Sequence, residues 1–222
     1  MISAAQLWAT NLLPEFLVRL LDLSDPWLAL AALDECMAEL ADDRQGTIHP
    51  GAVVEGPLYL APGASIGPGA LVQGPAWIGE GAEVGHGAYV RGGAILAPGA
   101  KVGHSSEVKR SVLLNSAKLP HFNYVGDSVV GNNVNLGAGV KVANFNAFGN
   151  GITVSGGGGL KLRKAGALLG DGVSVGCNAV LAPGTVIGAR TVIYNGANIR
   201  GVVPADSVVK VRTTLETVSR SY

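Results

Sequence analysis

An aliphatic residue recurs every six positions from Ile48 onward, and this repeat is the strongest constraint on the fold. The series comprises Ile48, Val54, Leu60, Ile66, Val72, Ile78, Val84, Val90, Leu96, Val102, Val108 and Leu114. An alanine, commonly preceded by glycine, stands four positions after most of them. An α-helix cannot keep this pattern, because each glycine or proline would cost roughly 1 to 3 kcal/mol in a helix interior. Short strands joined by tight turns can keep it, so the repeat predicts a stack of short strands.

The repeat is interrupted in its second half. Its register slips near Leu119 and again near Val130, and the pattern then continues to Val142. It resumes at Leu169, Val175, Leu181, Ile187, Ile193 and Ile199. The interruption, at about residues 144–167, contains four consecutive glycines and a basic group. These basic residues are Lys161, Arg163 and Lys164. An insertion of this kind predicts a loop that leaves the stack at one corner.

Composition changes abruptly at residue 46. None of the 33 glycines precedes Gly46, and residues 1–45 carry a net charge of −6 against +6 for the rest. The N-terminal segment has helix signals, because Pro14 opens an apolar run and Ser24-Asp25-Pro26 precedes a second one. In that second run Leu30, Leu33, Met37 and Leu40 recur at helical spacing. We therefore predict a helical cap at 1–45, a repeat domain at 46–205 and a C-terminal tail at 206–222.

The composition also excludes several classes of protein. A hydrophobic content of 48% argues against disorder, and the absence of a Gly-X-Y period excludes collagen. Cys36 and Cys177 provide neither a disulfide framework nor zinc-ligand spacing. A net charge of zero with few aromatic residues disfavours nucleic-acid binding. Charges interrupt the N-terminal apolar stretch, so we expect no membrane segment, no signal sequence and a cytoplasmic location.

The six-residue pattern resembles the left-handed parallel β-helix, in which three hexapeptides form one triangular coil. The resemblance supplies the handedness and implies a homotrimer. Side chains one coil apart would stack at strand spacing, about 4.8 Å. Arg91 and Lys109 are three hexapeptides apart, so they either splay into solvent or hold an anion between them. His86 and His104 have the same spacing, which invites a metal site or, alternatively, two histidines on a solvated corner.

Three motifs carry a closer resemblance. They are Glu107-Val108-Lys109, the segment Leu119-Pro120-His121-Phe122-Asn123-Tyr124-Val125-Gly126-Asp127, and Gly131-Asn132-Asn133-Val134-Asn135-Leu136-Gly137-Ala138-Gly139. They resemble the acetyltransferase half of bifunctional N-acetylglucosamine-1-phosphate uridyltransferase/glucosamine-1-phosphate N-acetyltransferase. The match is best with the subgroup that has an extension after Ala143-Asn144, which here ends in the basic segment 163–167. Residues 1–45 are too few for a nucleotidyltransferase domain, so a standalone acetyltransferase of nucleotide-sugar biosynthesis is expected.

The resemblance implies acetyl-CoA as co-substrate, an amino-sugar 1-phosphate as acceptor, and a role for each matching residue. His121 would be the general base, with Glu107 orienting it and Asn144 near the amine and the acetyl group. The acceptor contacts would be Arg91, Lys109, Tyr124 and Asn135. The acetyl-CoA contacts would be Ala138, Cys177, Asn195 and Arg212. Transfer would be direct, with no acyl-cysteine at Cys177. Residues 144–153 contain no lysine, although the resemblance implies one there that helps to hold the sugar phosphate.

Two other classes of function remain open from the sequence. A metal-dependent hydratase of the γ-carbonic anhydrase type would use His86 and His104, although His121 follows one position short of a full coil. A non-catalytic, sugar-phosphate-binding or scaffolding trimer would account for the missing lysine. For the trimer, the sequence offers apolar residues placed just before the stripe as a candidate intersubunit surface. These are Tyr59, Leu71, Trp77, Tyr89 and Ile95.

Overall fold

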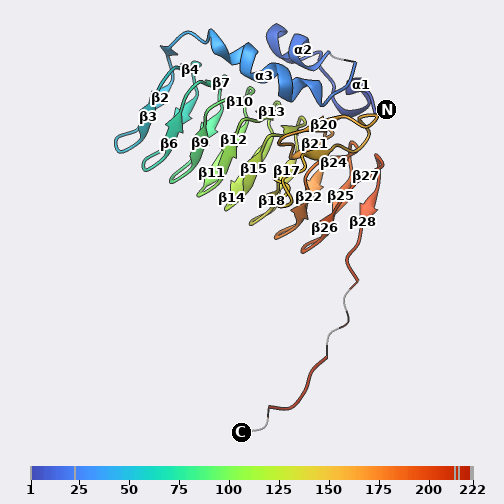
Figure 1. The fold of residues 1–222 in the computed structure, drawn as a ribbon. Helices are drawn as coiled ribbons and strands as arrows, with labels where there is room; N and C mark the ends of the chain where they lie inside the picture. The colour runs from blue at the N-terminus through green and yellow to red at the C-terminus, as the bar shows by residue number, and fades with distance from the viewer. Residues whose placement is uncertain (1, 23, 213, 215, 221–222) are drawn as a thin grey trace.

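The computed structural model describes residues 2–22, 24–212, 214 and 216–220. Short parallel strands stack along one axis into three sheets, and each coil of the chain gives one strand to each sheet (Figure 1). The fold is a left-handed parallel β-helix with a helical N-terminal cap, which confirms the predicted fold class. Among the described residues, no helix is long and apolar enough to cross a membrane.

The strands have the following bounds. The first sheet contains β1 (Asp43–Arg44), β4 (Leu58–Leu60), β7 (Ala76–Ile78), β10 (Ala94–Leu96), β13 (Val112–Leu113), β16 (Val129–Val130), β21 (Ala167–Leu169), β24 (Thr185–Ile187) and β27 (Val202–Val203). The second contains β2 (Thr47–Ile48), β5 (Ser65–Ile66), β8 (Glu83–Val84), β11 (Lys101–His104), β14 (Lys118–His121), β17 (Asn135–Leu136), β22 (Ser174–Val175), β25 (Val192–Ile193) and β28 (Val208–Val209). The third contains β3 (Val53–Glu55), β6 (Leu71–Gln73), β9 (Tyr89–Arg91), β12 (Glu107–Lys109), β15 (Tyr124–Gly126), β18 (Lys141–Val142), β23 (Val180–Leu181) and β26 (Asn198–Ile199).

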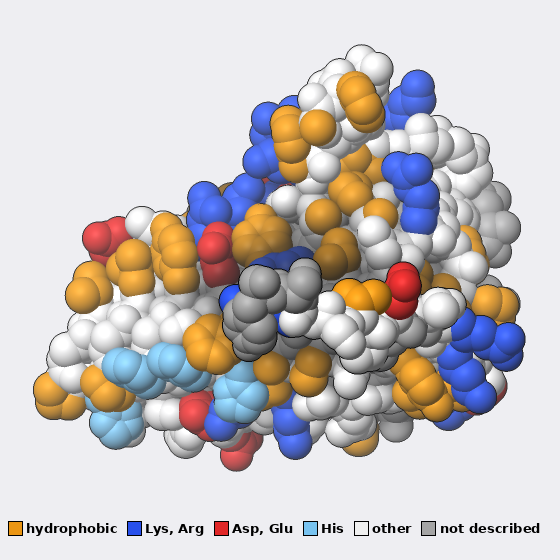
Figure 2. Space-filling model, turned by 90° about the horizontal axis from the view of Figure 1, so that it is seen from below, with side chains coloured by type: hydrophobic (Ala, Val, Ile, Leu, Met, Phe, Trp, Pro, Cys, Tyr) orange, Lys and Arg blue, Asp and Glu red, His pale blue; other side chains and the backbone are white. Residues whose placement is uncertain are grey.

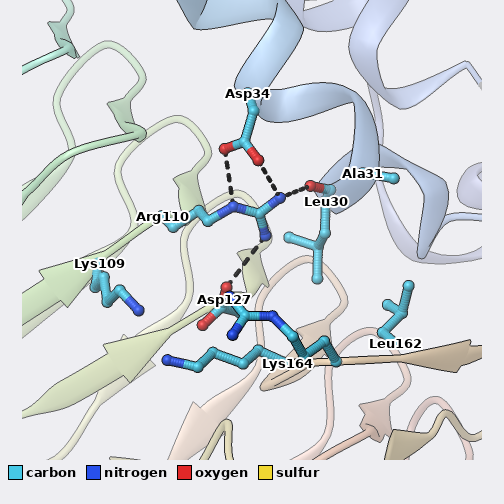
Figure 3. A pocket seen from close by; sticks show the side chains of 9 residues that line it. Leu30, Ala31, Asp34, Lys109, Arg110, Asp127, Leu162 and Lys164 are labelled. Carbon is cyan, nitrogen blue, oxygen red and sulfur yellow. Dashed lines mark hydrogen bonds and ion pairs between the residues drawn. The ribbon is translucent and has the colours of Figure 1, made fainter. Parts of the chain in front are cut away.

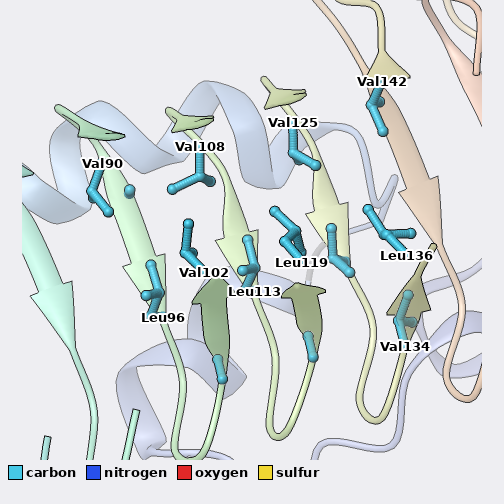
Figure 4. Close-up of a cluster of buried hydrophobic side chains, with 14 of the residues drawn as sticks. Val90, Leu96, Val102, Val108, Leu113, Leu119, Val125, Val134, Leu136 and Val142 are labelled. Atoms are coloured by element: carbon cyan, nitrogen blue, oxygen red, sulfur yellow. The ribbon is translucent and has the colours of Figure 1, made fainter. Parts of the chain in front are cut away.

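The aliphatic stripe forms the core of the β-helix. Figure 4 shows its side chains pointing inward from all three sheets, with Val90, Val108, Val125 and Val142 following one another along the axis. The last member of the predicted series is wrong. Leu113, and not Leu114, occupies the inward position, because the first register slip falls between Val108 and Leu113. Leu114 points outward and is buried under the cap.

Coil length changes along the axis and decides which side chains stack. Most early coils contain three full hexapeptides, as the pairing of Glu107 with Tyr89 shows. From the pairing of Ile95 with Val112 as far as β18, each coil is one position shorter, and we call these the short coils. His104 and His121 are therefore register partners. The spacing from His104 to His121 is one position less than three hexapeptides, and because the coil is shortened by the same amount, His121 lies in the histidine column.

The cap consists of α1 (Ala4–Leu7), α2 (Glu15–Leu21) and α3 (Leu28–Ala38), which lie over the first sheet (Figure 1). Their apolar side chains pack on the outer face of that sheet, against Ile95 and Leu114 among others. Trp8 and Trp27 are buried there, and each indole N–H donates to a backbone carbonyl, at 2.8 Å and 2.9 Å.

The cap corrects part of the predicted intersubunit surface. Trp77 packs edge-on against Phe16 of α2, and Ile95 is fully buried beneath the cap. These two residues therefore attach the cap to the β-helix and are not available to another subunit. In the part of the chain that the structure describes, all three helices lie over the first sheet, and none covers the second or the third (Figure 1).

The insertion leaves the β-helix after β18 and rejoins it at β21. It contains an antiparallel hairpin of β19 (Ile152–Thr153) and β20 (Lys161–Leu162). Val129 and Leu168 are register partners although the whole insertion separates them in sequence, so the stack continues unbroken across it. Ile152 and Val154 of the insertion are buried in the same cluster as the cap. This packing brings the basic end of the insertion toward the third sheet and α3.

Candidate functional site

The two predicted stacked cations lie on adjacent strands of the third sheet. Arg91 and Lys109 are register partners, which confirms the coil arithmetic. Arg91 does not splay into solvent, because its Nη1 donates to Oε1 of Glu107 at 2.9 Å. This hydrogen bond raises the pKa of Arg91 above its usual value. Arg91 and Lys109 also line a shallow groove of about 440 Å³ that runs along the ends of the third-sheet strands.

A third cation joins this pair from the insertion. Lys164 lies beside Lys109, as Figure 3 shows. Burial lowers the pKa of the Lys109 ammonium, and contact with Lys164 lowers it further. Lys164 was not among the predicted site residues, because the lysine was expected directly after Asn144, whereas the hairpin returns one from the far end of the insertion. The basic group Lys161, Arg163 and Lys164 was its sequence signal.

Lys109 and Lys164 line a cavity of about 310 Å³ between the β-helix, the insertion and α3. Lys109, Arg163 and Lys164 contribute to its wall, and Asp34 and Asp127 contribute carboxylates (Figure 3). Two ammonium groups this close repel each other unless an anion is bound or one of them loses its proton. The cavity is therefore suited to a small anionic group such as a phosphate.

Asn144 is buried at the edge of this site and is held from two sides. Its Nδ2 donates to Oδ2 of Asp127 at 2.5 Å, and its Oδ1 accepts from the hydroxyl of Tyr124 at 3.3 Å. Burial, followed by the charge of Glu107, raises the pKa of Tyr124, so this hydroxyl keeps its proton. Gly126 makes room for the arrangement, because a Cβ there would collide with the Asn144 amide. The structure thus brings together Arg91, Lys109, Tyr124 and Asn144 of the predicted site.

His121 lies at another corner, where β14 ends, and is exposed. It continues a column that begins with His86 and His104, whose rings stack at 5.3 Å between centroids. Figure 2 shows the histidines in a row on this face. Within the described residues, no bond joins Glu107 to His121, and the Glu107 carboxylate is paired with Arg91 instead. The same part of the chain contains no group of three or more His, Cys, Asp or Glu side chains able to hold a metal ion.

The predicted cofactor residues extend the histidine column toward the C-terminus. The N–H of Gly139 donates to the carbonyl of His121, and that of Asn178 to the carbonyl of Ala138, so successive coils place Ala138 after His121. Cys177 and Asn195 follow in the next coils, and the Asn195 side chain accepts from the Cys177 N–H at 2.8 Å. Asn195 also lines a groove of about 510 Å³.

Two predicted residues lie away from these groups. Asn135 is exposed on the second sheet, whereas Tyr124 belongs to the third sheet. Arg212 lies beyond β28, in the exposed C-terminal segment. A single chain therefore presents the predicted site in two parts, namely an anion-binding part on the third sheet and a His121 column on the corner beside it.

Comparison with known proteins agrees with this architecture. Residues 72–161 match the model of the GMPPB C-terminal domain, and residues 166–201 match that of the bacterial transferase hexapeptide, six repeats. The bifunctional protein GlmU of Methanococcus maripaludis is 46% identical over 179 residues, which cover 80% of this chain and 43% of that protein. The chain is thus similar to hexapeptide-repeat proteins and to part of GlmU.

Further relatives show the same partial coverage. The GlmU of Methanococcus aeolicus is 34% identical over 194 residues, which are 85% of this chain and 46% of that protein. The bifunctional sugar-1-phosphate nucleotidylyltransferase/acetyltransferase of Sulfurisphaera tokodaii is 41% identical over 100 residues, or 41% of this chain and 23% of that protein. The chain thus spans less than half the length of these curated relatives.

Proposed function

We propose that this GlmU-related chain is an acetyl-CoA-dependent N-acetyltransferase whose acceptor is an amino-sugar 1-phosphate. The observation that carries the proposal is the gathering of Arg91, Lys109 and Lys164 next to Asn144. Lys109 and Lys164 line a small cavity, and Arg91 is the register partner of Lys109 on the adjacent strand. A cluster of cations of this kind matches a phosphate monoester better than it matches a neutral sugar. The bifunctional sugar-1-phosphate nucleotidylyltransferase/acetyltransferase of Sulfurisphaera tokodaii, to which the chain is similar, supports acetyl transfer and a sugar 1-phosphate in this chemistry.

The reaction follows from the placement of the chain's own groups. The acceptor phosphate binds among the cations. The bonds of Asn144 to Asp127 and Tyr124 leave one N–H and one oxygen lone pair of its amide free, and these contact the amine of the acceptor. His121 removes a proton as the amine attacks the thioester carbonyl of acetyl-CoA. The new C–N bond forms, the C–S bond breaks, and coenzyme A leaves as a thiol after taking up the proton. Backbone N–H groups at the small residues near Ala138 stabilise the oxyanion.

A homotrimer completes the site in this proposal. The cap covers the first sheet, so neighbouring subunits must pack on the second and third sheets. Exposed apolar side chains are available there, including Phe122, Val180, Val192 and Tyr194. A neighbour on this surface brings the His121 column of one chain to the cation cavity of another, which a single chain does not do. Acetyl-CoA then lies in the groove between subunits, along Ala138, Cys177 and Asn195. A cytoplasmic location stays a prediction.

A thiol-release assay tests the proposal. The purified protein is mixed with acetyl-CoA and either glucosamine 1-phosphate or glucosamine, and free coenzyme A is measured. We expect release with the phosphorylated acceptor and little with the unphosphorylated one. The absence of release with any amino-sugar phosphate would favour the non-catalytic sugar-phosphate binder.

A further inference from the structure

A ladder of polar side chains connects the N-terminal cap to Asn144. Arg110, Asp127 and Asn144 follow one another at the spacing of the short coils. Each contacts the next, since Arg110 Nη1 donates to Asp127 Oδ1 at 3.1 Å and Asn144 donates to the other oxygen of Asp127. Asp34 of α3 stands at the outer end of the ladder (Figure 3). The ladder therefore runs from the surface of the cap to a buried amide of the site.

Arg110 is clamped by the cap. Its Nε and Nη2 donate to the two oxygens of Asp34, both at 2.9 Å, and Nη2 also donates to the carbonyl of Leu30 at 2.6 Å. The planar guanidinium makes these bonds and the bond to Asp127 in one fixed orientation. The single ammonium of a lysine does not reproduce this set of bonds. Helix α3 thus sets where Arg110 points.

Asp127 transmits this orientation to Asn144. Its side chain is only 2% exposed, and its two oxygens serve different neighbours, Arg110 on one side and Asn144 on the other. A buried carboxylate is retained when its partners satisfy its charge and lone pairs, so Asp127 depends on both bonds. With Nδ2 facing Asp127, the Asn144 amide has one orientation, and its oxygen faces Tyr124.

We propose that Asp34, Arg110 and Asp127 are positioning residues that fix the Asn144 amide, so that the cap forms part of the site. The role of Asn144 in the reaction rests on the proposed function, whereas the fixing of its amide does not. The cap does not need Asp34 in order to stay attached. Its apolar cluster and the indole bonds of Trp8 and Trp27 already hold it on the first sheet. The carboxylate of Asp34 is therefore available for positioning.

The first test is Asp34→Asn, with Glu35→Gln as the matched control. Both remove one negative charge from adjacent exposed positions of α3. We expect Asp34→Asn to lower kcat roughly 2- to 30-fold, the range for mutations that act through an intermediate network, while the KM for acetyl-CoA and the Tm match the control. In ¹⁵N NMR spectra of the full chain, the side-chain amide signals of Asn144, assigned through their loss in Asn144→Ala, should shift in Asp34→Asn only.

The second test is Arg110→Lys, which keeps the positive charge and loses the planar guanidinium with its several N–H donors. If Arg110 only neutralises Asp127, the Arg110→Lys protein will keep wild-type kcat and wild-type Asn144 amide signals. That result would overturn the proposal. We expect Arg110→Lys to have a lower kcat and shifted Asn144 amide signals. Unchanged Asn144 signals and unchanged kcat in Asp34→Asn would also overturn it. Should the wild type release no coenzyme A, the proposed function fails, and the NMR comparison still decides whether the cap positions Asn144.

Discussion

The early coils and the short coils of the β-helix use the same fold for different purposes. In the early coils, most corners that need a left-handed backbone carry glycine, as at Gly63, Gly69 and Gly81. From Ser105 to Asn133 every such corner carries a side chain. These residues are Ser105, Arg110, Ser116, Phe122, Asp127 and Asn133. A left-handed conformation costs a residue with a Cβ roughly 1 to 2 kcal/mol, so the short coils accept strain that the early coils avoid.

The difference shows where the chemistry of this molecule resides. Glycine corners give a regular ladder that serves as a scaffold. The corners with side chains project an arginine and an aspartate toward Asn144, and the short coils align these groups along one column. The candidate site therefore occurs where corner glycines are replaced by residues with side chains. Substitutions should act differently in the early coils and in the short coils.

The largest expected effect is at His121. His121→Ala should lower the acetylation rate roughly a hundredfold to ten-thousandfold, the usual range for loss of a general base. His104→Ala is the matched control, because His104 is the register partner of His121 one coil earlier. Steady-state rates with saturating acetyl-CoA make the comparison. Equal losses in the two variants would mean that the column acts through packing and that His121 has no special role.

The next effect concerns the anion. Arg91→Ala should weaken acceptor binding by about 2 to 3 kcal/mol, which is the scale of a charge-assisted hydrogen bond and corresponds to roughly 30- to 150-fold. Acetyl-CoA affinity should stay nearly the same. Lys101→Ala serves as the control, since Lys101 also pairs with a carboxylate, Glu83, but on the second sheet. Isothermal titration with the acceptor measures both, and equal weakening in the two variants would contradict an anion site at Arg91.

A pair of glycine substitutions separates the two regions directly. Gly126→Ala should lower kcat about tenfold or more, because the new Cβ displaces the Asn144 amide. Gly81→Ala should destabilise the fold by about 1 to 2 kcal/mol without changing the rate, since Gly81 has a positive φ and open space beside it. Thermal unfolding and turnover are measured for both. A Gly126→Ala protein with normal turnover would show that Asn144 is not needed where it lies.

The smallest effect is a pH dependence from Lys109. Its folded pKa is lowered, so above that value the unfolded chain holds more protons, and stability rises with pH up to the ordinary pKa of an unfolded lysine. Below the folded pKa the penalty is constant. As the pH rises toward about 10.4, the ordinary pKa of lysine, wild type should therefore gain stability relative to Lys109→Met, by less than about 1 kcal/mol because the group is largely solvated. Saturating inorganic phosphate should abolish this gain, and its persistence would argue against an anion between the lysines.

The periodic part of the molecule follows from the sequence because one residue type repeats at one spacing. The stripe predicted the coils and two register slips, near Leu119 and near Val130. The first slip lies earlier than predicted, between Val108 and Leu113. Their consequence was harder to see. A short coil realigns every later column, and only the alignment in space shows that His121 follows His104.

The site was predicted less completely, for a physical reason. Arg91 and Lys109 come from neighbouring coils, so their stacking could be derived from spacing. Lys164 and Asp34 come from an insertion and from a cap, whose positions depend on packing between parts that share no period. The pairing of Glu107 with Arg91 also escaped prediction, because it depends on which of two nearby groups the carboxylate contacts.

The most direct test of the account is the dependence of acetyl transfer on the phosphate of the acceptor, in wild type and in Lys164→Met. We expect wild-type kcat/KM for glucosamine 1-phosphate to exceed that for glucosamine greatly, and Lys164→Met to lower this ratio mainly by losing activity on the phosphorylated acceptor. Thiol release with both acceptors, measured at one ionic strength, gives the ratio. A wild-type ratio near one, or a ratio unchanged in Lys164→Met, would contradict a phosphate site built by the β-helix and the insertion together.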